Sequence, residues 1–230
     1  MIVYGRNPVR EALRGPREVT HVWATKNAVR EPWLSAAKVR VSPASAEEIE
    51  HRSGSGSHQG MRAEVSHFHY ASPDALTAAT SALIVVLDQV QDPQNLGSIC
   101  RTAECAGAAG VVIPDRRAAE VTAAVCKASA GAVEHLPVAR VRNVADFLKD
   151  VKAAGGWCYG ADRGGAVHYD AVDYGGTVAL VLGSEGRGLR PRVAGTCDAL
   201  VSIPLRGRIE SLSVSAAAAV LLFAAAAGRG

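Results

Sequence analysis

A glycine-rich loop near the C-terminus carries a carboxylate in a position suited to ligand binding. The unbroken apolar run at residues 178–182 predicts a strand buried on both faces of a parallel sheet. The loop 183–189 follows, with three glycines within six residues around Glu185. Glycine lets backbone amide and carbonyl groups approach a ligand closely at the carboxyl end of a strand. The spacing therefore predicts a binding site at this loop.

A second polar loop follows the next predicted strand. Residues 199–204 form another apolar run, residues 205–213 are mostly polar, and an alanine-rich helix is predicted over 214–227. Ser211 and Ser213 stand at the end of the loop, just before that helix. Loops at the carboxyl ends of neighbouring parallel strands meet at one edge of a sheet. We therefore expect both loops to contribute to one active site.

A third polar segment, residues 88–103, offers an amide and a guanidinium group. Pro93 requires an extended approach, Asn95 can cap a helix, and Arg101 lies nearly two turns into that helix. From the residue types alone, Asn95 is an ordinary N-cap and Arg101 is a surface charge. The apolar neighbours of Arg101 nevertheless favour an anionic partner, because a guanidinium is seldom buried without one.

An α/β domain over residues 81–230 must position these groups. Strands and helices alternate along it, which predicts a mostly parallel sheet flanked by helices. Strands are expected at 82–89, 110–113, 136–141, 157–161, 177–182 and 199–203. Besides the C-terminal helix, helices are expected at 95–106, 118–131, 143–154 and 191–197.

Residues 1–70 are predicted to form a small α/β domain, which a linker at 71–80 joins to the larger one. Its strands are expected at 2–4, 19–24, 40–41 and 63–70, with helices at 8–14, at 33–38 and after Ser45. Asn7 is the expected N-cap of the first helix, and the residues from Ser45 to Glu48 form a capping box.

Composition indicates a soluble globular protein of 230 residues with a full-sized core, since 48% of its residues are hydrophobic. The net charge of +3 is unevenly distributed. Residues 1–62 hold ten Lys and Arg against six Asp and Glu, whereas residues 63–230 hold fifteen against sixteen. A basic N-terminal part fits a module that binds a polyanion, and it fits an ordinary solvated surface equally well.

Several kinds of site are disfavoured. The five cysteines are odd in number and include no Cys-x-x-Cys pair, which indicates reduced thiols of a cytoplasmic protein and no zinc site. We expect no signal peptide and no membrane-spanning segment. His135 and His168 lack acidic or cysteine partners at metal spacing. Trp23, Trp33 and Trp157 are expected in the core rather than on a base-stacking surface.

Three motifs, in order, resemble those of the SpoU (TrmH) branch of the SPOUT RNA methyltransferases. They lie at residues 88–103, 182–186 and 203–215. The resemblance implies a C-terminal trefoil knot, S-adenosylmethionine as cofactor and methylation of a ribose 2′-hydroxyl of RNA. Residues 5–9 and 58–60 resemble the N-terminal RNA-binding domain of many family members, which is similar to ribosomal protein L30e.

The resemblance also implies roles for individual residues. The matching catalytic positions are Asn95, Arg101, Glu185, Ser211 and Ser213. The positions expected to bind the cofactor are Leu182, Gly183, Gly188, Ile203, Leu205 and Leu212. RNA contacts are expected from Arg6, Arg10, Lys26, Arg62 and Arg101, and no metal is expected. We expect a homodimer that pairs through the apolar helix at 214–227.

One departure from the family pattern is Ser213, where the family usually has asparagine. Serine keeps a hydroxyl but loses the second donor of the amide. A catalytically silent RNA-binding protein therefore stays an alternative. A nucleotide-dependent oxidoreductase lacks support, because no Gly-x-Gly-x-x-Gly follows the first strand of the larger domain. Within the family, the sequence most resembles enzymes that methylate a guanosine of 23S rRNA, with tRNA methylation and resistance-conferring rRNA methylation as alternatives.

Overall fold

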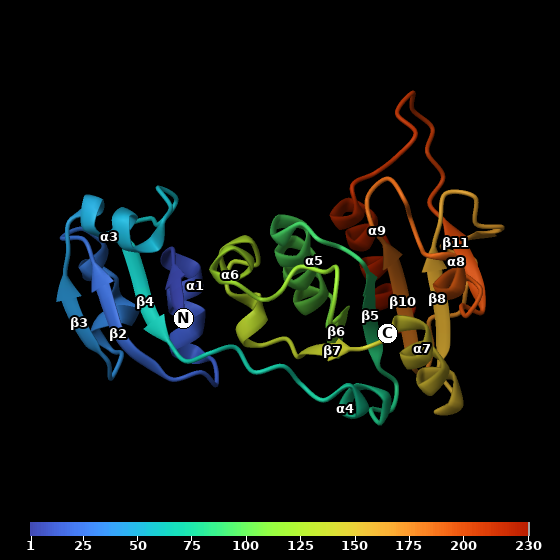
Figure 1. Cartoon of the computed structure of the whole chain (residues 1–230), viewed down its shortest axis with the longest axis horizontal. Coiled ribbons are helices and arrows are strands. Elements are labelled where there is room, and N and C mark those ends of the chain that lie inside the picture. The colour runs from blue at the N-terminus through green and yellow to red at the C-terminus, as the bar shows by residue number, and fades with distance from the viewer. Residues whose placement is uncertain (230) are drawn as a thin grey trace.

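The computed structural model describes residues 1–229, which form two α/β parts (Figure 1). The smaller part holds β1 (Ile2–Tyr4), α1 (Arg6–Arg14), β2 (Val19–Ala24), η1 (Ala28–Arg30), α2 (Pro32–Ser35), β3 (Arg40–Pro43), α3 (Ala46–Ser53) and β4 (Met61–Val65). Its sheet has the order β1-β4-β2-β3, in which only the β2–β3 pair is parallel. The smaller part therefore combines helices with a four-stranded mixed sheet.

Two helix starts in the smaller part were predicted, with different outcomes. The capping box is confirmed: Glu48 N donates to Ser45 Oγ at 3.2 Å, and Ser45 N donates to Glu48 Oε2 at 2.8 Å. The cap predicted at Asn7 is wrong, because the N-cap of α1 is Gly5 with φ of 101°. Arg6 N donates instead to Gln59 Oε1 at 3.0 Å. The first backbone amide of α1 thus bonds a side chain from a distant part of the chain.

The larger part is built on a seven-stranded sheet with the order β7-β6-β5-β10-β8-β11-β9. Its strands are β5 (Leu83–Asp88), β6 (Gly110–Pro114), β7 (Val138–Val141), β8 (Trp157–Ala161), β9 (Val167–His168), β10 (Val178–Gly183) and β11 (Ala199–Ser202). All pairings in this sheet are parallel, which confirms the predicted sheet type. The edge strand β9 is too short to show a hydrophobic pattern and was not predicted.

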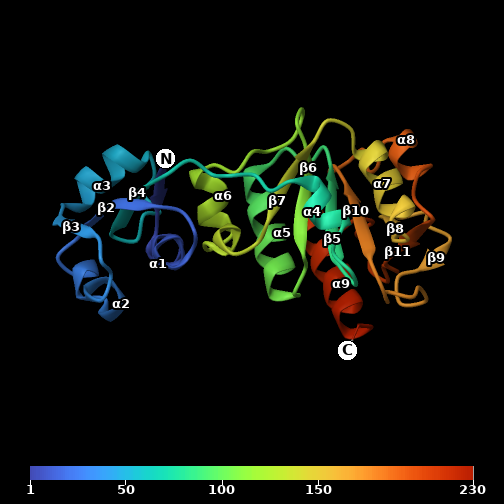
Figure 2. The same cartoon turned by 90° about the horizontal axis from the view of Figure 1, so that it is seen from below.

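Helices cover both faces of this sheet (Figure 2). α5 (Pro93–Cys105) and α9 (Val214–Ala227) pack on one face, and α6 (Ala123–Ala128) and η2 (Ala132–Glu134) lie beyond α5. α4 (Pro73–Thr77), α7 (Val144–Ala153) and α8 (Pro191–Ala194) cover the other face. The helix predicted from residue 118 starts only at Ala123, because the preceding backbone bonds elsewhere: Val121 N donates to Tyr70 Oη at 3.0 Å.

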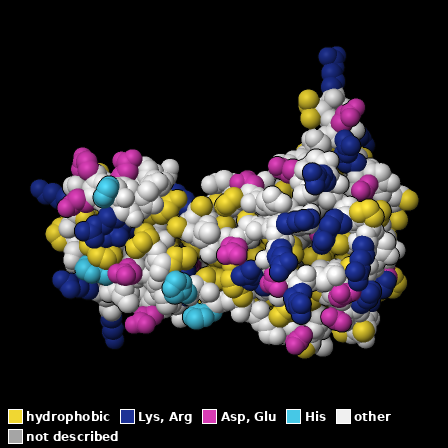
Figure 3. Space-filling view, viewed as in Figure 1, with side chains coloured by type: hydrophobic (Ala, Val, Ile, Leu, Met, Phe, Trp, Pro, Cys, Tyr) yellow, Lys and Arg dark blue, Asp and Glu magenta, His cyan; other side chains and the backbone are white. Residues whose placement is uncertain are grey.

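The predicted linker at 71–80 is packed against the larger part. Ala71 N donates to Val138 O at 2.8 Å, and Leu76 of α4 is buried under the sheet. The space-filling view shows two lobes that meet across a narrower waist (Figure 3). One hydrophobic cluster extends through both lobes, from Val3 and Val9 to Val125 and Val133. The two parts therefore share a core.

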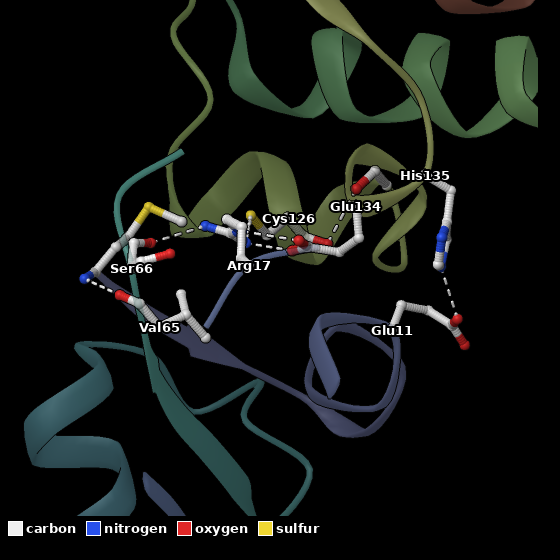
Figure 4. Close-up of polar contacts among 9 residues, drawn as sticks. Glu11, Arg17, Val65, Ser66, Cys126, Glu134 and His135 are labelled. Carbon is white, nitrogen blue, oxygen red and sulfur yellow. Dashed lines mark hydrogen bonds and ion pairs between the residues drawn. The ribbon is translucent and has the colours of Figure 1, made fainter. Parts of the chain in front are cut away.

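A buried ion pair lies in the contact between the two parts (Figure 4). Arg17 Nε donates to Glu134 Oε2 at 2.8 Å, and Nη2 also donates to this carboxylate. The two side chains are only 4% and 1% exposed. Beside the pair, His135 Nε2 lies 3.0 Å from Glu11 Oε2. A Cβ at Gly131 would lie 2.7 Å from the Cβ of Glu11, so the two parts are close-packed here.

Candidate active site

A cavity of about 550 Å³ opens at the carboxyl ends of β8, β10 and β11, and three loops line it. The six residues expected to bind cofactor all line this cavity: Leu182, Gly183, Gly188, Ile203, Leu205 and Leu212. It is also lined by three of the predicted catalytic residues, Glu185, Ser211 and Ser213. The two polar loops therefore form one site.

The loop after β10 folds back on itself. Gly188 N donates to Ser184 O at 2.9 Å, which closes the turn. A Cβ at Gly183 would lie 2.1 Å from the carbonyl carbon of Gly188, so this crossing requires glycine. Gly186 and Gly188 have φ of 80° and 65°, a region that side chains disfavour. The loop thus presents backbone groups to the cavity.

A buried carboxylate holds the far end of this loop. Asp88, at the end of β5, is fully buried and accepts from Arg190 N at 2.9 Å and from Arg190 Nε at 2.7 Å. β5 pairs with β10, and Asp88 is in register with Gly183. The Asp88–Arg190 pair therefore fixes both ends of the loop relative to β5. This pair was not predicted from the sequence. The one feature that could have indicated it is an aspartate at the end of an apolar run.

A second cavity, of about 360 Å³, adjoins the first and shares Ser184, Glu185, Arg187 and Val214 with it. Asn95 also lines this cavity, and its Nδ2 donates to Glu185 Oε1 at 3.1 Å. The first and second motifs, 90 residues apart in sequence at these positions, are therefore in direct contact.

The alternative that Asn95 is a plain N-cap is wrong. The N-cap of α5 is Asp92, whose carboxylate oxygens accept from Gln94 N and Asn95 N, each at 3.2 Å. Because Asp92 caps the helix, the Asn95 side chain is free to bond Glu185. Residue types alone could not separate these cases, since aspartate and asparagine are equally good caps.

Arg101 is exposed on α5 and lines neither cavity. The anionic partner expected for it is not found, because among residues 1–229 it forms no ion pair. Its apolar sequence neighbours Ile99, Cys100 and Ala103 are buried, whereas Arg101 faces solvent. Helical periodicity places neighbouring residues on different faces, so apolar neighbours in the sequence do not imply a buried guanidinium.

Ser213 is the N-cap of α9, where its Oγ accepts from Ala216 N at 3.2 Å. Serine and asparagine are comparably good N-caps, so the departure from the family pattern keeps this structural role. The loop before it is tied to the loop after β8, because Arg163 Nη1 donates to Glu210 O at 3.0 Å.

The loop after β8 is a part of the site that the sequence analysis missed. Ala161, Asp162, Arg163 and Gly164 line the larger cavity, and Gly164 N donates to Asp162 Oδ1 at 2.8 Å. The available signal was a polar, glycine-containing turn at the end of a third strand of the same sheet.

The residues expected to contact RNA in the smaller part lie outside both cavities. Arg6 is exposed and lies 2.8 Å from Glu31, Arg10 lies 2.7 Å from Glu11, and Lys26 is exposed. The expectation for Arg62 is corrected, because it is 3% exposed. Arg62 Cζ lies 3.7 Å from the ring centroid of Trp23, so stacking on the sheet holds the guanidinium away from solvent.

Three further observations bear on the kinds of site predicted. Trp157 is 55% exposed, so its expected place in the core is wrong. The part of the chain that the structure describes contains no group of three or more His, Cys, Asp or Glu suited to a metal. Within residues 1–229, no helix has the length and apolar character needed to cross a membrane.

Comparisons with known proteins agree with this geometry. The model of the SpoU rRNA methylase family matches residues 82–223, and the model for RNA 2′-O ribose methyltransferase substrate binding matches residues 2–71. A Bacillus subtilis protein assigned to the TrmH family of tRNA/rRNA methyltransferases is 38% identical, over 96% of this chain and 93% of its own length.

Two solved structures are similar over nearly the whole chain. One is an AdoMet-bound rRNA methyltransferase from Sinorhizobium meliloti, 27% identical with a TM-score of 0.81, covering 97% of this chain and 85% of that one. The other is an RNA methyltransferase of the TrmH family from Porphyromonas gingivalis, 30% identical with a TM-score of 0.78. The match covers 99% of this chain and 88% of that one. The second and third motifs line one cavity, the Asn95–Glu185 bond joins the first motif to the second, and the family models match both parts, so the chain belongs to the SpoU family of RNA methyltransferases.

Proposed function

We propose that this protein transfers the methyl group of S-adenosylmethionine to a ribose 2′-hydroxyl of RNA. The observation that carries the proposal is the Asn95–Glu185 hydrogen bond, which joins two motifs where the two cavities meet. The larger cavity, at about 550 Å³, falls within the range of cofactor sites. When bound, S-adenosylmethionine supplies an electrophilic methyl group on a positively charged sulfur.

The residues of the larger cavity suit a nucleoside. Leu182, Ile203 and Leu212 provide apolar walls, while the backbone of the loop after β10 provides hydrogen-bonding groups. Ser211, which lines the same cavity, would help shape it. Nucleoside sites combine such apolar walls with a few fixed polar groups.

The remaining predicted catalytic residues would act on the RNA. Asn95 orients Glu185, and together they position the nucleotide beside the cofactor cavity. Arg101 would bind a backbone phosphate and stabilise the developing alkoxide, since it is exposed and a guanidinium stays protonated. Methyl transfer needs alignment of the two reacting groups above all, and the adjoining cavities would hold the two groups side by side.

We propose rRNA as the substrate, with a guanosine of 23S rRNA as the target and tRNA as the alternative. Support comes from the match to the rRNA methylase family and from a relative assigned to tRNA/rRNA methylation. We accordingly propose that the protein acts in the cytoplasm. The alternative of a catalytically silent RNA-binding protein was suggested by Ser213. It is less well supported, because Ser213 caps α9 and the six residues expected to bind the cofactor all line the larger cavity.

We also propose a homodimer that pairs through α9. No charged residue occurs between 214 and 227, and Phe223 is 53% exposed. Ala216 and Ala227 are exposed on the same helix, so an apolar face is left to solvent in the single chain. The trefoil knot and the likeness to ribosomal protein L30e stay predictions from the family resemblance.

The test is methyl transfer from tritiated S-adenosylmethionine to rRNA and tRNA extracted from a strain that lacks this protein. We expect label in rRNA, and after nuclease digestion in a 2′-O-methylnucleoside. A 2′-O-methyl group also protects the adjacent phosphodiester from alkaline cleavage, which locates the nucleotide. Label on a base, or nicotinamide dinucleotide binding in place of S-adenosylmethionine binding by calorimetry, would contradict the proposal.

A further inference from the structure

Arginines follow the carboxyl ends of most strands in the large sheet. They are Arg116 and Arg117 after β6, Arg142 after β7, Arg163 after β8, Arg187 and Arg190 after β10, and Arg206 and Arg208 after β11. Because the strands are parallel, these residues lie at one edge of the sheet, the edge that holds the cavity. They are eight of the fifteen Lys and Arg in residues 63–230.

This concentration does not reflect a basic domain. Residues 63–230 hold fifteen Lys and Arg against sixteen Asp and Glu, a net charge of −1 with neutral histidine. Just over half of the basic residues of this part therefore lie at one edge of its sheet. Figure 3 shows Lys and Arg side chains gathered over the larger lobe in this view.

Arg116, Arg117 and Arg142 lie outside both cavities and are exposed. None of the three forms an ion pair with any residue from 1 to 229. The arginines after β8, β10 and β11 include members with roles in the site, such as Arg190, which holds Asp88. The three after β6 and β7 have no role in the site described above.

The carboxylates next to these three arginines contact a different arginine. Arg140, on β7, lies 3.3 Å from Asp115 Oδ1 and 3.3 Å from Glu120 Oε1. These are the acidic residues of the loop that carries Arg116 and Arg117. Arg140 and the three exposed arginines together carry four positive charges against these two carboxylates, which leaves a net charge of +2 in this group.

Arg116, Arg117 and Arg142 lie between the smaller lobe and the larger cavity. β7 is the edge strand on that side of the sheet, and Ala71, at the end of the smaller part, bridges to Ala139 of β7. Figure 1 shows β6 and β7 between the smaller part and β10. A polyanion that touched both the smaller part and the cavity would pass the loops after β6 and β7.

We propose that Arg116, Arg117 and Arg142 form a phosphate-binding track that guides the substrate RNA from the smaller lobe to the cavity. The proposal rests on the proposed function and adds the surface along which its substrate lies. Guanidinium groups match phosphate oxygens in geometry and charge. Contacts of this kind set the register and orientation of a nucleic acid without reading its sequence.

The experiment measures RNA binding by fluorescence anisotropy at several KCl concentrations, with a fluorescein-labelled RNA stem-loop as probe. The variant is R116Q/R117Q/R142Q, and the single variant Arg142→Gln serves if the triple variant fails to fold. The matched control is Lys149→Gln, because Lys149 is 61% exposed and lies on α7, the helix that begins just after Arg142. Binding of S-adenosylmethionine, measured by calorimetry, reports whether the cavity is intact.

We expect the triple variant to bind RNA about tenfold more weakly at low salt. The slope of log affinity against log salt should become shallower by about 0.7 to 0.9 for each phosphate that the variant no longer neutralises. Lys149→Gln should bind like the wild type. Wild-type affinity and slope in the triple variant would overturn the track, even if the wild type methylates RNA. A second outcome separates the two proposals. If the wild type transfers no methyl group to RNA but the triple variant still binds RNA more weakly than the wild type, the track is supported and the proposed function is overturned.

Discussion

The contact between the two lobes and the carboxyl edge of the large sheet both contain charged groups, but in opposite states. In the contact, Arg17 and Glu134 are buried and paired (Figure 4). At the edge, Arg116 and Arg142 are exposed and form no ion pair within residues 1–229. A paired buried charge restricts geometry, because leaving either partner alone is costly. An exposed unpaired charge remains available to a substrate.

Glycine shows the same contrast. At the contact, a Cβ at Gly131 would overlap Glu11 of the other lobe, so glycine permits close packing. In the loop after β10, Gly183 lets the chain cross Gly188 and leaves a cavity beside it. Glycine thus permits a close approach in both regions, but to different neighbours. Opposite Gly131 lies a side chain of the other lobe, whereas opposite Gly183 lies the backbone of the same loop.

The largest expected effect is on stability, from Arg17→Ala. The substitution leaves Glu134 buried without its partner, which costs about 3 to 5 kcal/mol of unfolding free energy. Lys149→Ala, which removes an exposed pair with Asp146, should change it by about 0.5 kcal/mol or less. Urea unfolding measures both, and equal effects would show that burial does not distinguish the two pairs.

A double substitution sharpens this comparison. If the cost of Arg17→Ala comes from the uncompensated carboxylate, replacing Arg17 and Glu134 together by methionine should recover most of the missing stability. The same urea titration checks this. A double variant no more stable than Arg17→Ala would show that the pair itself, with its hydrogen bonds to Cys126 and Ser66, holds the lobes together.

At the catalytic edge, we expect Arg101→Ala to lower methyl transfer about 10²- to 10³-fold, because it removes a donor to charge that develops in the reaction. The affinity for S-adenosylmethionine should stay within a few fold, since Arg101 lines neither cavity. Single-turnover transfer and calorimetry measure the two quantities. Arg101→Lys, which keeps the charge without the planar fork, should retain part of the activity. Normal turnover with weakened cofactor binding would mean that Arg101 has another role.

Substitutions of Asn95 and Asp92, which lie within one turn of α5, should affect different properties: the rate of methyl transfer and the stability of the protein. Asn95→Ala removes the donor to Glu185 and should lower the rate of transfer about tenfold, with little change in melting temperature. Asp92→Ala removes the helix cap and should cost about 1 kcal/mol of stability. Kinetics with thermal melts of both variants test this. The reverse pattern would restore the N-cap interpretation of Asn95.

The smallest effect concerns thiol reactivity at the contact. Burial raises the pKa of Cys126 to about 11, although the neighbouring Arg17 opposes this, and burial raises the pKa of Cys100 to about 12. Such thiols are protonated and unreactive at about pH 8, whereas Cys105 is exposed. We expect Ellman's reagent to label Cys105 first in the wild type. In Arg17→Ala, Cys126 should react as well, and its continued protection would show that the contact stays closed without the ion pair.

The elements around the active site could be predicted from the sequence because their signals are local. Strands β5 and β10 are unbroken apolar runs, as expected for strands covered on both faces. The helix α9 begins and ends at the predicted residues. Since parallel strands end at one edge, the loops at 183–189 and 205–213 could be placed at one cavity before the fold was known.

Other features depended on partners far away in the chain, and only the tertiary structure decided them. Arg17 and Glu134 are 117 residues apart, and nothing near either residue indicates burial. Gln59 accepts from Arg6 N at the start of α1, and Asn95 is free for Glu185 because Asp92 caps its helix instead. A polar side chain bonds whichever partner the fold brings within reach, and local sequence does not contain that information.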